Sequence, residues 1–156
     1  MRIEVRAVGR MKSGPERDLF DEYLKRAQGQ GRALGFTAIE EREIDPRGKA
    51  DKRAETASLI QDLPVGAQIV ALDERGKDLT SREIAGKIES WRDQGIRDLV
   101  FLIGGADGLD RDQLSPSTHY IAFGRATWPH KMVRAMIGEQ IYRSIALMAG
   151  APYHRD

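Results

Sequence analysis

The stretch from Gly124 to Arg134, GRATWPHKMVR, gathers side chains that can bind and activate a substrate. An imidazole can exchange a proton near neutral pH, and a guanidinium can bind phosphate. His130 and Arg134 stand four residues apart, so in a helix they share one face. The alternative is that His130 is only a helix-start residue with local hydrogen bonds. Glu139 and Arg143 have the same spacing, which predicts an ion pair at the surface or at an interface.

The end of the chain, Ala151-Pro-Tyr-His-Arg155, differs from most chain ends, which are small, polar and frayed. An aromatic ring, an imidazole and a guanidinium are the groups that stack on an unpaired base and hold a phosphate. Tyr153, His154 and Arg155 are therefore candidates for contacts with a nucleic acid. The alternative is an anchored terminus in which Tyr153 packs on its own domain.

Gly104 and Gly105 directly follow the apolar run DLVFLI at residues 98–103. Neither glycine has a Cβ, so a ligand can approach the backbone closely. Taken alone, the pair is better explained by a tight turn between a strand and a helix. The chain has no G-x-G-x-x-G, G-x-x-x-x-G-K-[ST], G-x-S-x-G or H-E-x-x-H motif. Its three histidines have no metal-ligand spacing, so we expect no metal site.

Alternating strands and helices must position these residues. Apolar patterns predict strands at residues 2–8, 34–44, 67–72, 98–103 and 119–123. Capping boxes, glycines and prolines predict helices from the S-x-x-E box at Ser13–Glu16 to about residue 29, over 49–62, from the box at Thr80–Glu83 to Trp91, near 110–114, and from Pro129 to Met148. A basic loop, Asp45–Lys49, is expected before the second helix. This order of elements predicts a single α/β domain.

Two of the strands, 67–72 and 98–103, are apolar throughout, which is typical of a parallel sheet covered by helices on both faces. Ligands of such sheets bind at the carboxyl ends of the strands. Three segments leave strand ends there: Leu72 and Asp73, Gly104–Gly108, and Gly124–Pro129. The apolar residues of the last helix are predicted to pack in the core: Met132, Val133, Met136, Ile137, Ile141, Ile145 and Met148.

The 156-residue chain has the length of one domain, and it contains no cysteine. Disulfide scaffolds and a cysteine nucleophile are therefore excluded. The N-terminus MRIEVRAVGRMK has no apolar signal segment, and no apolar run approaches the roughly 20 residues that span a bilayer. We accordingly expect a cytoplasmic protein without a membrane partner.

The net charge of +1 argues against a nucleic-acid partner, because phosphate binders are usually clearly basic. The charge is segregated, however. Residues 1–60 carry a net charge of +2, residues 61–118 one of −4, and residues 119–156 one of +3. The last segment also holds all three histidines and five of the ten aromatic residues, so we expect the function to lie there.

Four motifs resemble, in order and spacing, those of the ribosomal large subunit methyltransferase H family. They are Phe101–Gly108, Thr127–Arg134, Glu139–Arg143 and Pro152–Arg155, and the segments Met1–Gly9 and Leu72–Lys77 match as well. Each motif alone is weak, but four in sequence are specific, and the likeness covers essentially the whole chain. The chain departs from the family at Ala106-Asp107, where Pro-Glu is common, at Gly124, where serine is common, and at Trp128, which replaces a smaller apolar residue.

The resemblance implies one α/β-knot (SPOUT) domain over residues 1–156, with a C-terminal trefoil knot and a knotted cofactor-binding part from about 67 to 156. It implies S-adenosylmethionine-dependent methylation of N3 of a pseudouridine in 23S rRNA on the assembled ribosome, by a homodimer. Threaded connections are rare, so the knot is expected from the resemblance alone. The cofactor site implied comprises Leu72, Gly104, Gly105, Gly124, Arg125, Ala126, Thr127, Trp128 and Pro129.

N3 of the target base is an imide N–H, which must lose its proton before or during attack on the methyl group. The catalytic candidates are His154 and Arg155 near the base, Tyr153 stacking on it, and His130 as a second candidate base; the proton acceptor is left open. The base must be unpaired or extruded. Two alternatives remain: a non-enzymatic ribosome- or RNA-binding module with a vestigial cofactor pocket, and an enzyme acting on a nucleotide-containing small molecule.

Overall fold

The computed structural model describes residues 1–45 and 51–156. The strands there form one sheet with the order β2-β1-β4-β3-β5, in which every neighbouring pair is parallel. The strands are β1 (Arg2–Val8), β2 (Ala38–Ile44), β3 (Gln68–Asp78), β4 (Asp98–Ile103) and β5 (His119–Ala122). The helices are α1 (Pro15–Gly31), α2 (Lys52–Ile60), α3 (Ser81–Asp93) and α4 (His130–Met148), with short 3-10 helices η1 (Arg32–Leu34) and η2 (Arg111–Gln113). The predicted α/β class is confirmed.

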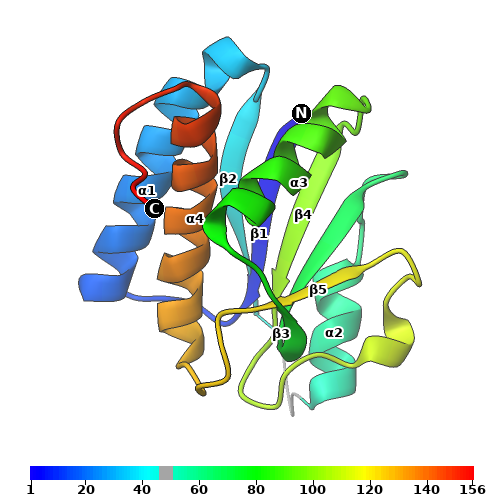
Figure 1. Ribbon diagram of the computed structural model, residues 1–156. Coiled ribbons are helices and arrows are strands. Elements are labelled where there is room, and N and C mark those ends of the chain that lie inside the picture. Colours follow the sequence, from blue (N-terminus) through cyan, green and yellow to red (C-terminus); the bar gives the residue numbers. More distant parts are fainter. Residues whose placement is uncertain (46–50) are drawn as a thin grey trace.

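Helices cover both faces of the sheet: α1, α3 and α4 lie on one face and α2 on the other (Figure 1). The central strand β4 shows why its sequence is apolar throughout. Leu99, Phe101 and Ile103 point into the larger core, which is closed by α1, α3 and α4. Val100 and Leu102 point into the smaller core, beside Leu59 of α2. Successive side chains of a strand face opposite ways, so both sets of residues are buried.

The two predicted capping boxes have different outcomes. At α3, Thr80 Oγ1 accepts from the backbone N–H of Glu83, and Glu83 Oε2 accepts from that of Thr80, as predicted. At α1 the prediction is wrong, because the helix begins one residue later. Gly14 is the N-cap and no side chain caps the helix, while Pro15 occupies the first turn, where its missing N–H costs nothing.

Several predicted boundaries shift in the structure. The strand predicted over 34–44 begins only at Ala38, because Leu34 belongs to η1 and Gly35 ends that turn with a φ of 90°. The helix predicted over 49–62 spans Lys52–Ile60, and the one expected near 110–114 is η2. The basic loop predicted at Asp45–Lys49 lies, apart from Asp45, outside the described residues.

Strand β3 extends well beyond the predicted residues 67–72, and its second half crosses β5 closely. Ile121 of β5 pairs with Leu72 and also with Lys77, with a register shift between them. A Cβ on Gly76 would lie 2.6 Å from backbone atoms of Ile121, so no side chain fits at that position. The trefoil knot expected from the resemblance stays a prediction.

We predict that Gly76→Ala destabilises the fold by about 1–3 kcal/mol, because β3 or β5 must move to admit the methyl group. Gly86 of α3 is the matched control, since a Cβ there meets no atom within 4 Å. Gly86→Ala should raise the free energy of unfolding by up to about 1 kcal/mol through helix propensity. Urea denaturation of both variants measures the difference, and equal stabilities would contradict the close crossing.

Candidate active site

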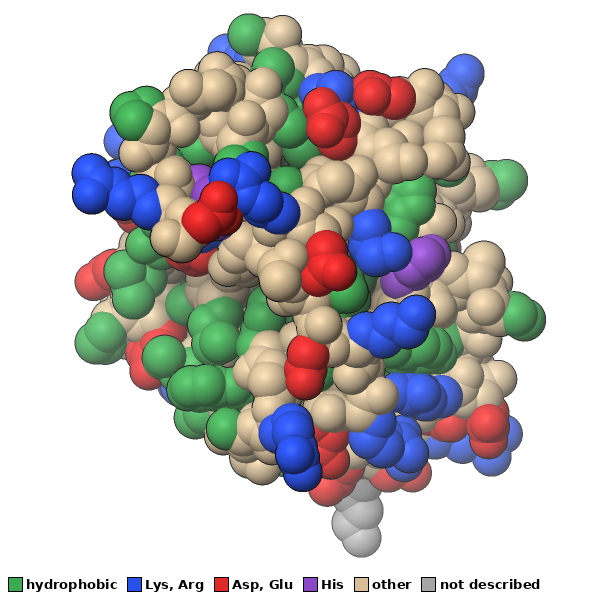
Figure 2. Space-filling model, in the orientation of Figure 1, with side chains coloured by type: hydrophobic (Ala, Val, Ile, Leu, Met, Phe, Trp, Pro, Cys, Tyr) green, Lys and Arg blue, Asp and Glu red, His purple; other side chains and the backbone are tan. Residues whose placement is uncertain are grey.

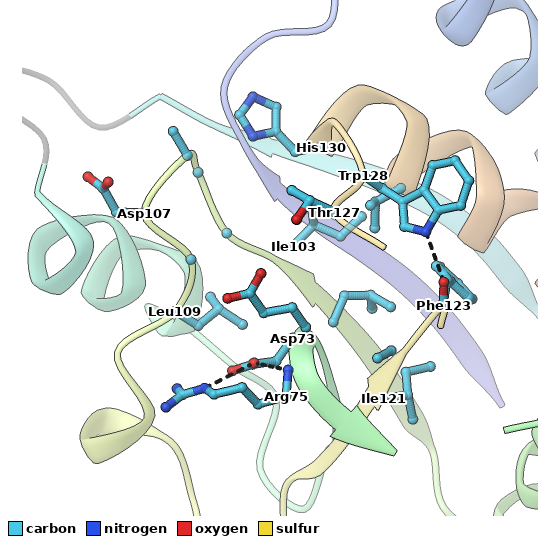
Figure 3. A pocket seen from close by; sticks show the side chains of 18 of the residues that line it. Asp73, Arg75, Ile103, Asp107, Leu109, Ile121, Phe123, Thr127, Trp128 and His130 are labelled. Carbon is cyan, nitrogen blue, oxygen red and sulfur yellow. Dashed lines mark hydrogen bonds and ion pairs between the residues drawn. The ribbon is translucent and has the colours of Figure 1, made fainter. Parts of the chain in front are cut away.

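A pocket of about 480 Å³ opens beside residues 72–75 of β3 and at the carboxyl ends of β4 and β5 (Figure 3). Its apolar wall is contributed by strand ends, by the loop after β4 and by the first turn of α4, and it includes Leu72, Ile103, Leu109, Ile121, Phe123 and Val133. Polar groups line the rest: Lys52, Asp73, Glu74, Arg75, Asp107, Thr127 and His130. The pocket therefore lies where the parallel sheet predicts a ligand site.

One wall of the pocket is the exposed loop between β5 and α4. At its start, the N–H of Gly124, with a φ of 81°, donates to Asp78 Oδ1 at 3.1 Å. Near its end, Trp128 Nε1–H donates to the carbonyl of Phe123 at 2.8 Å, which folds the loop back on the strand end (Figure 3). The loop ends where α4 begins at His130, and no side chain in the described part of the protein caps that helix. The first N–H groups of α4 are consequently left open to other partners.

The opposite wall is the glycine turn after β4. The N–H of Gly108 donates to the carbonyl of Gly105 at 3.0 Å, which closes the turn. A Cβ on Gly104 would lie 2.6 Å from the carbonyl oxygen of Gly108, and one on Gly105 would collide with the carboxylate of Glu55. Glu55 is buried, and its Oε2 has no hydrogen-bond partner among residues 1–45 and 51–156. The two glycines are therefore required by a tight turn and also form the surface of the pocket.

Asp73 contributes an ionised carboxylate to the wall of this pocket. Its carboxylate accepts from Arg111 Nε at 2.9 Å and from the backbone N–H of Arg75 at 2.8 Å, with the side chain only 8% exposed. Burial alone works to raise the pKa of Asp73, but the hydrogen bonds from Arg111 and Arg75 outweigh it and hold the pKa below its usual range. Arg111 in turn lies 4.0 Å from the ring centroid of Tyr120.

Most of the cofactor-site residues expected from the resemblance line this pocket. Those that line it are Leu72, Gly104, Gly105, Gly124, Ala126, Thr127 and Trp128, and the candidate base His130 lies at the same mouth. Arg125 and Pro129 belong to the loop but do not line the pocket. Segments that are more than 50 residues apart in the chain thus meet at one place.

The tail residues Tyr153, His154 and Arg155 lie away from this pocket in the structure. The Tyr153 ring packs edge-on against Tyr142 at 4.6 Å, and its hydroxyl donates to Glu139 Oε1 at 2.9 Å. Burial and the Glu139 carboxylate raise the pKa of Tyr153 well above its usual range. His154 lies between Arg143 and Asp156, whereas Arg155 is exposed. The tail runs back along α4 (Figure 1), and none of its residues lines the pocket of the same chain.

His130 and Arg134 share a helix but have different environments. Arg134 is buried, and its Nη1 donates to Glu43 at 2.7 Å while its Nη2 donates to the carbonyl of Gly9 at 3.0 Å. Burial opposes ionisation of Glu43, but hydrogen bonds from the Met11 N–H and from Arg134 lower its pKa. Arg134 thus fixes the first turns of α4 to the ends of β1 and β2, and His130 is left exposed at the pocket mouth.

Three groups around the pocket could not be identified from sequence patterns. Lys52 and Glu55 come from α2, and Arg111 comes from η2. Each is an ordinary charged residue on a short helix, and only the tertiary fold brings it to the pocket region. Lys52 lines the pocket, Glu55 lies against Gly105, and Arg111 bonds to Asp73. The ion pair predicted between Glu139 and Arg143 is confirmed at 2.6 Å. Its contact with the tail was not predicted.

Within residues 1–45 and 51–156, no three His, Cys, Asp or Glu side chains are placed to hold a metal ion. No helix in the same part of the chain is long and apolar enough to cross a membrane.

The parallel sheet and the pocket at its carboxyl ends agree with the sequence relationships. The profile of one family, described as predicted SPOUT methyltransferase, matches residues 1–154, and the chain belongs to this family of methyltransferases. A relative from Maricaulis maris (strain MCS10), the ribosomal RNA large subunit methyltransferase H, is 52% identical over the whole of both chains. Proteins of the same name from Hyphomonas neptunium (strain ATCC 15444) and Ruegeria sp. (strain TM1040) are 50% and 46% identical over 99% of each chain. The family expected from the sequence motifs is thereby confirmed.

We predict that Arg111→Met weakens the fold in a pH-dependent way. Because Asp73 has a lowered pKa in the folded state, its contribution to stability is present above about pH 4 and is lost as the pH falls through the folded pKa. The variant should lose about 1 kcal/mol at pH 7 and much less at pH 2. Urea denaturation across this range measures the change. Arg75→Met is the comparison variant, because Arg75 bonds to Asp73 through its backbone N–H and its exposed guanidinium lies 3.6 Å from Asp73 Oδ1. This variant should lose clearly less stability than Arg111→Met, and a loss of equal size would refute the assignment.

Proposed function

We propose that this chain is a cytoplasmic, S-adenosylmethionine-dependent methyltransferase that modifies N3 of a pseudouridine in 23S rRNA of the assembled ribosome. The observation that carries the proposal is the pocket itself, because the segments assigned to the cofactor by the resemblance converge on it. The relatives are named as methyltransferases of the large subunit's ribosomal RNA, and they match the chain along its full length. The distribution of charge along the chain adds support, since residues 119–156, which are basic and rich in aromatic residues, contain the start of α4 and the tail.

The residues of the pocket fit S-adenosylmethionine, which would supply an electrophilic methyl group on a positively charged sulfur. The apolar wall suits the face of an adenine ring, and the glycine turn leaves backbone groups within reach. The ionised Asp73 and the nearby Glu74 and Asp107 favour a ligand with positive charge. The departure at Gly124 is compatible with this role, because its contact in the structure is made by the backbone N–H.

We further propose that the active enzyme is a homodimer in which the tail of one copy reaches the pocket of the other. The pocket of a single chain contains His130 but no group from Tyr153, His154 or Arg155. Hydrophobic side chains gather on the surface over the start of α4 (Figure 2), and Trp128 is among the exposed large apolar residues. A symmetric interface covering such a surface would bring two tails to two pockets.

The chain's own groups divide the chemistry between them. Tyr153 keeps its proton at neutral pH, so it can stack on a base but cannot accept the N3 proton. A guanidinium has no acceptor either, so Arg155 would bind a phosphate or the negative charge that develops on the base. The imidazoles of His130 and His154 are left as the candidates for the proton acceptor. Most of the rate would come from holding base and cofactor at attack distance.

The test is incubation of the protein and radiolabelled S-adenosylmethionine with ribosomes that lack the modification. We expect label on N3 of one pseudouridine of the large-subunit RNA in assembled ribosomes, and much less in free 23S RNA. Label that is found only in free RNA or in protein would refute the proposed substrate. Calorimetry separates the non-enzymatic alternative, because a chain with no affinity for S-adenosylmethionine at millimolar concentration would be a binding module.

Removal of residues 152–156 should abolish methylation while S-adenosylmethionine binding is largely kept, because the tail does not line the pocket of its own chain. Calorimetry and the ribosome assay on the same preparation measure the two properties. Gly86→Ala is a suitable control, since this residue lies on α3 and does not line the pocket. Methylation at the wild-type rate by the truncated protein would rule out a role for the tail.

A further inference from the structure

A continuous chain of hydrogen bonds joins α4, the tail and α3 through five side chains: Glu139, Arg143, His154, Asp156 and Arg82. Arg143 Nη2 donates to Glu139 Oε1 at 2.6 Å, and Arg143 Nη1 lies 3.1 Å from His154 Nδ1. The other ring nitrogen, Nε2, lies 2.8 Å from Asp156 Oδ1. Arg82 then holds both carboxylate oxygens of Asp156, with Nε and Nη2 each at 2.7 Å. In Figure 2, basic, acidic and histidine side chains gather where the tail crosses α3 and α4.

The position of the protons in this chain follows from the chemistry of its members. A guanidinium can only donate, so Arg143 requires a free lone pair on His154 Nδ1. The proton of a neutral imidazole must then lie on Nε2, from which it is donated to the Asp156 carboxylate. A proton added at Nδ1 would face the guanidinium and lose this hydrogen bond. The geometry therefore selects one tautomer of His154, the neutral Nε2–H form.

We propose that Asp156, held by Arg82, is a positioning residue that fixes His154 in the neutral Nε2–H tautomer and thereby sets the direction of the tail that carries Arg155. Only the expected effect on methylation rests on the proposed function, whereas the tautomer of His154 does not. Both ring nitrogens of His154 are occupied in this arrangement. Of the two candidate bases, His130 is therefore the one whose ring nitrogens have no hydrogen-bond partner within the described residues, and His154 serves to position the exposed Arg155.

The surroundings of His154 are consistent with an anchoring role. Its side chain is only 8% exposed, and the charged groups around it are Arg143 and Glu139 of α4, Asp156 of the tail and, behind Asp156, Arg82 of α3. Hydrogen bonds from Arg82 and His154 lower the pKa of Asp156, so its carboxylate is ionised throughout the neutral range. Asp156 and Arg82 are 69% and 59% exposed, so their pair adds little to overall stability and acts through geometry.

The test is nitrogen-15 NMR of the full chain with labelled histidine, which distinguishes the two tautomers and the charged form of each ring. In the wild-type protein at neutral pH we expect His154 to show an unprotonated Nδ1 and a protonated Nε2. Asp156→Ala removes the acceptor and should give a mixture of tautomers. Asp156→Asn keeps an oxygen that accepts from Nε2–H, so it should restore the wild-type tautomer. Asp93→Ala is the matched control, because Asp93 is an exposed carboxylate paired with Arg92 away from the tail.

Methylation of ribosomes should follow the same order. We expect the Asp156→Ala rate to fall about fivefold, the size of one lost hydrogen bond, with unchanged affinity for S-adenosylmethionine. Asp156→Asn should recover most of that loss, and Asp93→Ala should have none. A wild-type His154 with its proton on Nδ1, or with spectra unchanged by Asp156→Ala, would overturn the proposal. The NMR result decides the matter even for a chain that does not methylate ribosomes, so the two proposals can fail separately.

Discussion

The close crossing of β3 and β5 is the constraint on which the pocket depends. Because Ile121 pairs with both Leu72 and Lys77, residues 73–76 of β3 depart from the regular pairing between the two strands. That departure carries Asp73 to the pocket wall, and it brings Asp78 to the N–H of Gly124. The loop after β5 is thus held by a strand that precedes it by more than 40 residues. Gly76 makes this approach sterically tolerable.

The sequence predicted the elements whose local pattern matches their environment. The apolar run at 98–103 is β4, because a strand buried on both faces needs apolar residues at every position. The second half of β3, with the sequence DERGKD, was not predicted, because its pairing with β5 depends on a distant strand and leaves polar residues in place. At Ser13 the capping pattern was present, but Gly14 provides the N-cap and moves the helix start by one residue. Local patterns fail where tertiary contacts decide the outcome.

The candidate site divides in the same way. The glycine turn and the loop at 124–130 could be located from the sequence, because they follow strands and carry unusual residue types. Glu55 and Arg111 could not, since nothing in a short charged helix indicates which strand end it will face. The tail was singled out as unusual, and its interpretation as an anchored terminus is confirmed for Tyr153, whereas its contact with a nucleic acid stays a prediction. Tyr153 packs on its own domain, as an anchored terminus would, and the packing leaves Arg155 exposed.

The structure shows that the nearly neutral net charge of the chain does not describe the charge on its surface around the site. Arg6 and Arg134 are buried, and each binds partners inside the protein. Arg6 bonds to Glu4 and to backbone carbonyls at the end of α2. Arg134 forms ion pairs with Glu41 and Glu43. These charges cancel inside the protein and contribute little to the surface potential.

Arg125, Lys131 and Arg155, by contrast, are exposed, and none of them forms an ion pair within the described residues. Arg125 and Lys131 flank the pocket mouth along the chain, and Arg155 would join them if the tail of a second copy reached that mouth. A net charge near zero is therefore compatible with a positive surface around the site. The net charge would attract a nucleic acid only weakly over a long distance, whereas local contacts to phosphate would stay strong. Recognition of an RNA by such a protein must then depend on the fit of a shaped surface, for which a folded ribosome is a better partner than a flexible strand.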